Sequence, residues 1–209
     1  MASSVQEPEA RERLLQAASE LFYRDGISAT GVDALTGRAN VAKATFYRHF
    51  PSKDDLVLAW LQQPEARWID SVVPELERRV ESPLGRLVGF WDALGDWLEA
   101  REYIGCPFLN SLVEIKDADV PPRREIESYV QEVEAYFARA AAAAGVPDPA
   151  EAARQLRYTA MGLVMGIRLE RSRRPIETAR ATTIALLASW LDTTPHDVEQ
   201  WIPDLDAGC

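Results

Sequence analysis

Basic and hydrogen-bonding side chains gather in one short stretch of the chain, residues 41–56, which reads VAKATFYRHFPSKDDL. The stretch contains Lys43, Thr45, Tyr47, His49 and Lys53. Lysine supplies charge to phosphate or to a guanine edge, threonine offers a hydroxyl and a methyl group, and tyrosine and histidine donate hydrogen bonds to phosphate oxygens. These residue types suit contact with nucleic acid, although the whole chain is acidic, with a formal net charge of -10.

The spacing within this stretch predicts a short helix over residues 41–50. Phe46 and Phe50 lie four residues apart and mark the buried side, while Lys43 and Tyr47 repeat the same spacing on another side. Lys53 falls in the first turn of the next helix, where unpaired backbone N–H groups favour an anion. The same spacing also fits a solvated helix face in a bundle, so spacing alone leaves both interpretations open.

Two further helices are expected before this one. The first runs over residues 9–25 and stops at Gly26, a residue free to adopt a positive φ. Thr30 can cap the second helix, residues 32–39, and Asn40 ends it in the left-handed conformation. Three short helices whose last two are joined by a tight turn describe a helix-turn-helix.

The rest of the chain also predicts helices, which gives an all-α fold with about nine helices. Ser52 and Asp55 form a capping-box pattern at the start of the fourth helix, which Pro64 should break. The apolar pattern then continues up to Pro74. We expect a helix-turn-helix domain over residues 1–51 and a larger helical domain over residues 52–209.

Composition is that of a soluble globular protein, with 47% hydrophobic and 27% charged residues among 209. No apolar run reaches the roughly 18 residues of a membrane span, and the N-terminal residues show no apolar signal core, so we expect a cytoplasmic protein. Residues 1–53 hold seven Lys/Arg and six Asp/Glu, whereas the other 156 residues hold 16 and 27. This asymmetry predicts two parts with different partners.

The N-terminal block, RERLLQAASELFYRDGISATGVDAL followed by VAKATFYRHFPSKDDL, resembles the DNA-binding domain of the tetracycline-repressor (TetR) family. The residues that carry the resemblance are Gly26, Thr30, Val41, Thr45, Phe46, Tyr47, His49, Phe50 and Lys53. The turn position usually held by glycine is Asn40 here, and Gly37 within the second helix costs roughly 1 kcal/mol relative to alanine. The resemblance implies a homodimeric repressor that a small molecule releases from a palindromic DNA operator. Repression is the family's default, so an activator remains an alternative.

The resemblance also implies a role for each DNA-binding residue. Lys43, Ala44 and Thr45 would lie near base edges. Phosphate contacts would come from Thr30, Tyr47, His49 and Lys53. No metal or cofactor is implied.

Beyond residue 56 the chain is rich in aromatic residues, for which core packing is the simpler interpretation. By resemblance, the middle helices would also enclose a small-molecule pocket for a flat or hydrophobic effector, or a cationic one should Asp92, Asp96 or Glu99 face inward. The candidate lining residues are Trp60, Trp68, Trp91, Tyr103, Phe108 and Tyr129. The effector would tilt the fourth helix and thereby change the separation of two recognition helices.

The last two long helices resemble the family's dimer interface. One is apolar over much of its circumference and carries Gly162 and Gly166 four residues apart, which permits close helix approach. The apolar residues assigned to a partner are Leu163, Ile167, Ile184, Leu187, Ala188 and Leu191. The two helices of one subunit and the same two helices of its partner would then form an isologous four-helix bundle.

The sequence contains few motifs that would indicate another function. Cys106 precedes an expected helix N-terminus, so it is either a buried structural cysteine or a redox sensor. Only His49 and His196 are present, and no metal-spaced cluster, phosphate loop or nucleophile motif occurs. An enzyme that uses scattered carboxylates and a helix-turn-helix that binds another protein are the remaining alternatives.

Overall fold

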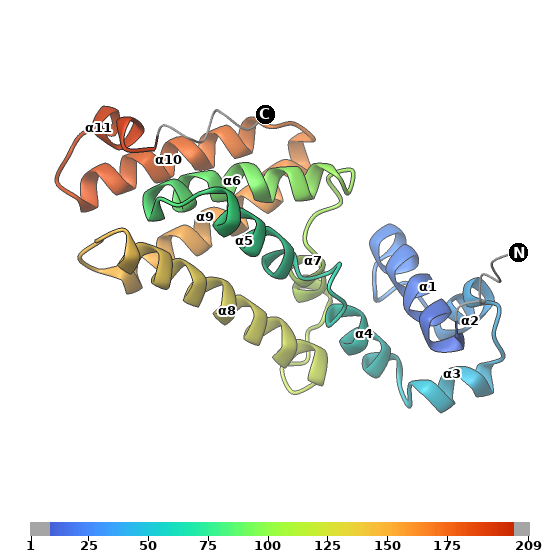
Figure 1. Ribbon diagram of the computed structural model, residues 1–209. Helices are drawn as coiled ribbons and strands as arrows, with labels where there is room; N and C mark the ends of the chain where they lie inside the picture. Colours follow the sequence, from blue (N-terminus) through green and yellow to red (C-terminus); the bar gives the residue numbers. More distant parts are fainter. Residues whose placement is uncertain (1–8, 203–209) are drawn as a thin grey trace, which may run out of the picture. The chain divides into compact units, whose positions relative to one another are not determined.

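The computed structural model describes residues 9–202 and contains eleven helices and no strand within that range (Figure 1). The predicted all-α class is confirmed. The count exceeds the expected nine because the chain breaks near Pro64, which divides the expected fourth helix in two, and because a short helix forms near the C-terminus. No helix in residues 9–202 is long and apolar enough to cross a membrane.

The helices fall into two compact units. Unit 1 combines the described residues up to Ala66 with Pro107–Glu127, and unit 2 combines Arg67–Cys106 with the described residues from Ser128 onward. Unit 1 holds α1 (Ala10–Asp25), α2 (Val32–Ala39), α3 (Lys43–His49), α4 (Lys53–Leu61), α7 (Pro107–Glu114) and the first residues of α8 (Pro121–Ala143). Unit 2 holds α5 (Trp68–Arg79), α6 (Pro83–Glu99), the rest of α8, α9 (Pro149–Glu170), α10 (Arg174–Trp190) and α11 (Pro195–Gln200). The first unit therefore extends past the predicted boundary at residue 51 and takes in α4 and α7.

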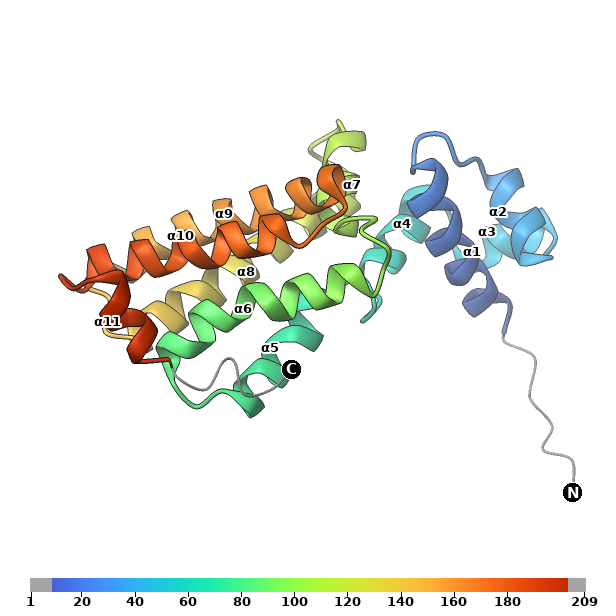
Figure 2. The same cartoon turned by 90° about the horizontal axis from the view of Figure 1, so that it is seen from above.

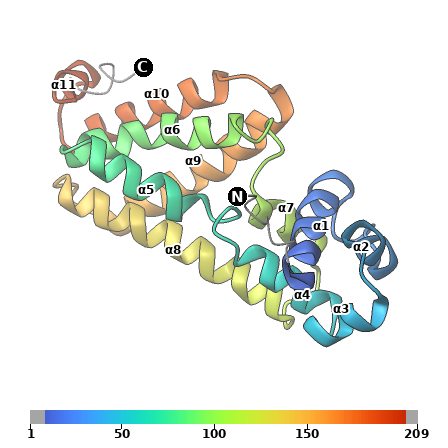
Figure 3. The ribbon, with the colours of Figure 1, turned by 45° about the vertical axis from the view of Figure 1, so that its right-hand side comes forward.

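Unit 1 is organised around α1, which packs against α2, α3 and α4 (Figure 3). Its buried face includes Leu14, Ala18 and Leu21, spaced three to four residues apart as on one side of a helix. The helix ends at Gly26, whose φ of 89° lies in the region that favours glycine.

The turn between α2 and α3 has the backbone pattern of a Schellman motif. Asn40 adopts the left-handed conformation, with φ 52° and ψ 53°, as its residue type predicts. Its N–H donates to the carbonyl of Gly37 at 3.3 Å, and the N–H of Val41 donates to the carbonyl of Thr36 at 3.1 Å. These two bonds fix the direction in which the chain leaves α2 and thereby orient α3.

Two prolines act differently on the helices that contain or precede them. The capping box of Ser52 and Asp55 opens α4, which ends at Leu61 before Pro64, as predicted. Pro74, by contrast, lies inside α5, which continues to Arg79. Proline at this point removes one backbone donor, and its ring is exposed.

Unit 2 is a bundle in which α9 and α10 lie side by side as an antiparallel pair and α6 packs against both (Figure 2). α6 approaches α10 closely at Gly95, where an added Cβ would lie 2.8 Å from Cγ1 of Ile176. α5 packs on another side of α6. The bundle core contains an aromatic cluster around Phe90, whose ring centroid lies 4.8–5.6 Å from those of Trp68, Trp91, Tyr136 and Phe137.

Candidate nucleic-acid interface

Helix α3 has one buried face and one solvent face. Phe46 is fully buried and Phe50 nearly so, with ring centroids 6.1 Å apart, and the guanidinium of Arg11 lies 5.5 Å from the Phe50 ring. The ring of Tyr47 contacts that of Phe46 edge-on, with ring centroids 5.2 Å apart, and Tyr47 is nevertheless 48% exposed. The aromatic pair therefore anchors the helix and leaves its outer face open, as the sequence predicted.

The predicted α3 residues share this outer face to different degrees. Lys43, Ala44 and Tyr47 are exposed, whereas Thr45 and His49 are half-buried. The five residues lie within two turns of one helix and can meet the same ligand surface.

Lys43 has a carboxylate partner that sequence reasoning missed. Its Nζ lies 2.8 Å from Oδ1 of Asp33, the second residue of α2. The hydrogen bond to Asp33 and the charge of that carboxylate raise the pKa of Lys43 above its ordinary value. Both side chains are more than half exposed, so this pair is a weak, salt-screened contact that a phosphate can replace.

The two predicted phosphate contacts outside α3 are engaged elsewhere in unit 1. Thr30 is 2% exposed, and its hydroxyl donates to the carbonyl of Gly26 at 2.7 Å instead of capping α2. Gly31 is the N-cap of α2 and supplies no side chain. Lys53 donates from Nζ to the carbonyl of Ile27 at 2.5 Å, which uses one of its three N–H bonds. A buried Thr30 side chain offers nothing to phosphate, whereas Lys53 keeps two donors.

Besides Asp33, two residues of unit 1 were given no role in the sequence analysis. Arg48 is exposed on α3, one turn after Ala44, and this spacing of four could have identified it. Glu114, at the end of α7, accepts a hydrogen bond from the backbone N–H of Ser28 at 2.7 Å. No local pattern could have revealed Glu114, because its partner is a backbone group 86 residues away in the sequence.

Comparison with known proteins supports the resemblance of the N-terminal block and extends it. Residues 14–60 match the model of the bacterial regulatory proteins of the tetR family, and residues 83–183 match the tetracyclin repressor-like C-terminal domain. The crystal structure of a TetR-family transcriptional regulator from Streptomyces coelicolor is 31% identical and has a TM-score of 0.80. That match covers 87% of this chain and 96% of the other. The chain belongs to the TetR family.

The curated relatives that carry names of HTH-type transcriptional regulators include an activator and a repressor. The transcriptional activator FasR of Mycolicibacterium smegmatis is 37% identical over 94 residues, which is 44% of this chain and 41% of FasR. The transcriptional repressor KstR of Rhodococcus jostii is 38% identical over 84 residues, which is 40% of this chain and 36% of KstR. The matches span less than two thirds of the length of the first curated relatives.

The six aromatic residues predicted to line a pocket of this TetR-family chain divide between the two units. Trp60 and Phe108 belong to unit 1, where the Trp60 ring lies 5.2 Å from that of Phe22. Trp68, Trp91 and Tyr129 lie in the core of unit 2. Tyr103 follows α6, has a φ of 61° and donates its hydroxyl to Glu99 at 2.8 Å. The six residues do not form one cluster within either unit.

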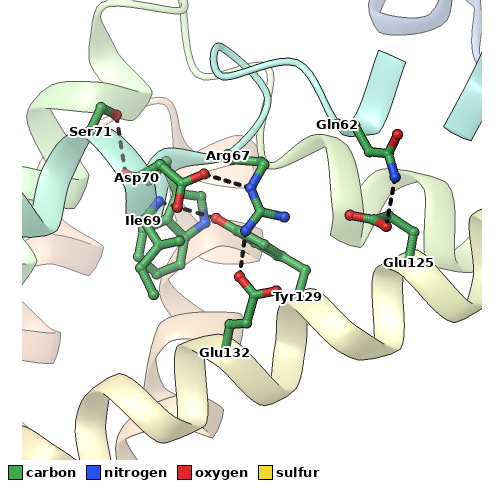
Figure 4. A network of polar contacts seen from close by, with 9 residues as sticks. Gln62, Arg67, Ile69, Asp70, Ser71, Glu125, Tyr129 and Glu132 are labelled. Atoms are coloured by element: carbon green, nitrogen blue, oxygen red, sulfur yellow. Dashed lines mark hydrogen bonds and ion pairs between the residues drawn. The ribbon is translucent and has the colours of Figure 1, made fainter. Parts of the chain in front are cut away.

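Tyr129 has a structural role within unit 2 (Figure 4). Its hydroxyl oxygen accepts a hydrogen bond from the backbone N–H of Ile69 at 3.2 Å, and burial raises the pKa of Tyr129. The guanidinium of Arg67 lies 4.9 Å from the Tyr129 ring and pairs with Asp70 at 2.5 Å and with Glu132. These contacts tie the start of α5 to α8 in unit 2. In unit 1, Gln62 donates separately to Glu125 at 3.1 Å.

Most residues predicted to contact a partner chain are covered by their own chain. Leu163, Ile167, Ile184, Leu187 and Ala188 are all less than 8% exposed within unit 2, and Leu191 is partly exposed. A side chain enclosed in the core of one subunit has little surface left for another. These residues therefore stabilise the bundle itself.

A different row of α9 is exposed. Tyr158, Met165 and Leu169 are 62%, 53% and 84% exposed, and Gly162 lies between them at helical spacing. The row sits on α9 opposite the residues that pack into unit 2.

The remaining candidate residue, Cys106, is 2% exposed and lies directly before α7. Cys209, the second cysteine, lies outside the described residues. No group of histidine, cysteine and acidic side chains in residues 9–202 could hold a metal ion.

Proposed function

We propose that this TetR-family chain is a homodimeric, ligand-responsive DNA-binding regulator of transcription, most simply a repressor that a small molecule releases from a palindromic operator. The observation that carries the proposal is the outer face of α3, with Lys43, Ala44 and Tyr47 exposed above the buried Phe46 and Phe50. In this role the protein acts in the cytoplasm by binding and not as an enzyme, in line with relatives that are named as regulators.

In this proposal α3 enters the major groove. Lys43, Ala44 and Thr45 lie near base edges, and Tyr47 and His49 donate to phosphates. Arg48 joins the exposed face as a further cation, since guanidinium binds both phosphate and guanine. Lys53 contributes its remaining donors to phosphate, whereas the Thr30 side chain acts only within its own loop.

A second copy of the chain completes the operator-binding form. We place the contact on the exposed row of Tyr158, Gly162, Met165 and Leu169, because large apolar side chains at this exposure gain most from a partner. The neighbouring helix α10 presents small exposed residues such as Ala185, which allow close helix approach. Two recognition helices must then lie about 34–36 Å apart to enter successive major grooves.

The charges of unit 2 favour an uncharged effector. Arg180 pairs with Asp92 at 3.2 Å, and Arg173 pairs with Asp96 at 2.9 Å and with Glu99 at 2.6 Å. Burial raises the pKa of Asp92, and the nearby charge of Arg180 opposes that effect. The three carboxylates that would have attracted a cation are thus neutralised by arginines of the same unit.

Two buried polar atoms in the aromatic cluster of unit 2 support the same conclusion. Trp91 Nε1 and the Tyr136 hydroxyl have no hydrogen-bond partner among residues 9–202, and both rings contact Phe90 and Phe137. A buried donor without a partner costs about 1–3 kcal/mol. We propose that the effector is a flat apolar molecule whose acceptor atoms pair with these donors.

The DNA-binding part is tested by selecting DNA from a random pool with the full-length protein and measuring its affinity over a series of salt concentrations. We expect Lys43→Ala to lower the affinity and to reduce the salt slope by about one unit for each lysine removed. Lys116→Ala is the matched control, since Lys116 is exposed in unit 1 but lies outside α3. Absence of salt-dependent binding would instead favour a helix-turn-helix that binds another protein.

The effector part is tested with the selected DNA. Uncharged aromatic ketones should release it, whereas aromatic ammonium ions of similar size should not. Trp91→Phe should weaken the response to ketones, because the indole N–H donor is lost while an aromatic ring remains at this position. Release by the ammonium ions alone would contradict the uncharged effector and leave DNA binding intact.

A further inference from the structure

One peptide group in unit 1, between Ile27 and Ser28, is held at both ends by charged side chains. Lys53 Nζ donates to its carbonyl oxygen at 2.5 Å, and its N–H donates to Oε2 of Glu114 at 2.7 Å. No peptide bond within residues 9–202 is cis, so the carbonyl and the N–H of this group point to opposite edges of the peptide plane. The lysine and the carboxylate therefore approach this group from opposite sides.

The two charged residues come from distant parts of the sequence. Lys53 is the first residue of α4 and Glu114 is the last residue of α7, and both belong to unit 1. Hydrogen bonds with an ionised partner are stronger than those between neutral groups, and two on one peptide reinforce each other. This arrangement, which we call the 27–28 clamp, fixes a loop that would otherwise be held by neutral contacts.

The clamped loop leads directly into the helix-turn-helix. It connects α1 to α2, and the hydroxyl of Thr30 closes it by donating to the carbonyl of Gly26. The orientation of α2 then determines that of α3 through the turn at Asn40. A shift of the loop is thus passed to the outer face of α3.

Gly26 makes the approach of Glu114 feasible. A Cβ at position 26 would lie 3.0 Å from Oε2 and 3.1 Å from Oε1 of Glu114, and the φ of 89° disfavours other residues. A side chain here would push the carboxylate away from the Ser28 N–H. The glycine and the carboxylate form one local arrangement.

We propose that Glu114 is a positioning residue for DNA binding: through the 27–28 clamp it holds the loop that orients α2 and α3. The inference rests on the proposed DNA-binding function. It assigns a role to a residue of α7, outside the N-terminal segment 14–60 that matches the family model. The expected sign is diagnostic, because removal of a carboxylate that merely repels phosphate would strengthen DNA binding.

The test compares Glu114→Ala with Asp119→Ala in the full-length protein, using DNA that the wild type selects from a random pool. Asp119 is an exposed carboxylate of the same unit, so both variants lose one negative charge. We expect Glu114→Ala to weaken binding about tenfold, the effect of one charge-assisted hydrogen bond. The salt slope should stay unchanged, because Glu114 does not contact phosphate. Asp119→Ala should bind as tightly as the wild type or slightly more tightly.

Rescue and amide exchange separate positioning from a general loss of structure. Glu114→Gln keeps an oxygen that accepts from Ser28 and should recover most of the binding. Hydrogen exchange of the 27–31 amides should quicken in Glu114→Ala and stay near wild type in Glu114→Gln. Gly26→Ala, which displaces the carboxylate without changing it, should reproduce the effects of Glu114→Ala.

Two results would overturn the clamp: equal or tighter DNA binding by Glu114→Ala, or unchanged exchange of the 27–31 amides in that variant. If Glu114→Ala does not fold, DNA binding and amide exchange are instead compared between Glu114→Gln and Gly26→Ala. The clamp is refuted if Gly26→Ala binds DNA and exchanges its 27–31 amides as the wild type does. A wild-type protein that selects no DNA overturns the proposed function instead, and the exchange measurement still tests the clamp.

Discussion

The contact between α6 and α10 gives a quantitative test of how unit 2 is packed. Gly95 lies in α6, and a Cβ added there would overlap Cδ1 of Ile176 and lie 2.8 Å from its Cγ1. Carbon atoms pack at about 3.5–4.0 Å, so the two helices or the Ile176 side chain must move by several tenths of an ångström or more. Ile176 is only 1% exposed, so its side chain cannot move into solvent.

Two opposing effects set the size of the change in Gly95→Ala. Overpacking a core lowers the free energy of unfolding by about 1–3 kcal/mol, whereas replacing glycine by alanine inside a helix raises it by about 1 kcal/mol. We therefore expect Gly95→Ala to lower the free energy of unfolding by up to about 2 kcal/mol. In an Ile176→Ala background the clashing atoms are gone, so the same substitution should raise that free energy by about 1 kcal/mol.

Urea denaturation, followed by circular dichroism and tryptophan fluorescence, measures all four members of this double-mutant cycle. Ile176→Ala alone should cost about 2–5 kcal/mol through the cavity that it leaves. Gly37→Ala serves as the control, because no atom lies within 4 Å of its added Cβ and only the gain in helix propensity applies. If Gly95→Ala is stabilising by the same amount in both backgrounds, α6 and α10 do not approach each other at this point.

Three further substitutions test the interface, the partner surface and the cysteine. Asp33→Asn removes the carboxylate beside Lys43 and should strengthen DNA binding at low salt, opposite in sign to Lys43→Ala; weaker binding would mean that Asp33 is needed to hold Lys43 in place. Gly162→Ala meets no atom within 4 Å in one chain but should raise the dissociation constant of the dimer, measured by sedimentation, because the proposed partner helix would approach at this position; an unchanged constant would contradict the proposed interface. Cys106 should react with a water-soluble thiol reagent at least about tenfold more slowly in the native protein than in urea, in a Cys209→Ser background; fast native labelling would instead favour a redox sensor.

Features of unit 1 that depend on neighbouring residues were readable from the sequence. Ser52 and Asp55 form their capping box because both partners lie within one helical turn. Asn40 takes the left-handed conformation for which its short polar side chain is suited. The spacing of Phe46 and Phe50 likewise gave the buried face of α3. Each of these depends on rules that act over three to five residues.

Features that depend on distant contacts were not readable in the same way. Periodicity showed that α9 is apolar over much of its circumference, but it could not tell the side facing the chain's own core from the side facing a partner. Leu163 and Ile167 are buried in unit 2, whereas Met165 and Leu169 are exposed. Both pairs are apolar, and only the position of α10 and α6 determines which pair is buried.

Lys53 is a residue whose partner the sequence motif does not determine. The family motif places a lysine at the start of α4, and a lysine there can contact either a DNA phosphate or a carbonyl group of its own chain. Its Nζ donates to the carbonyl of Ile27 and keeps two further donors. Because Glu114 holds the other end of the same peptide group, the position of Lys53 is coupled to a carboxylate 61 residues further along the chain. In the proposed clamp, Glu114 thus supports the DNA-binding face of α3 although it is acidic, because it binds the backbone N–H of Ser28 and does not contact the DNA.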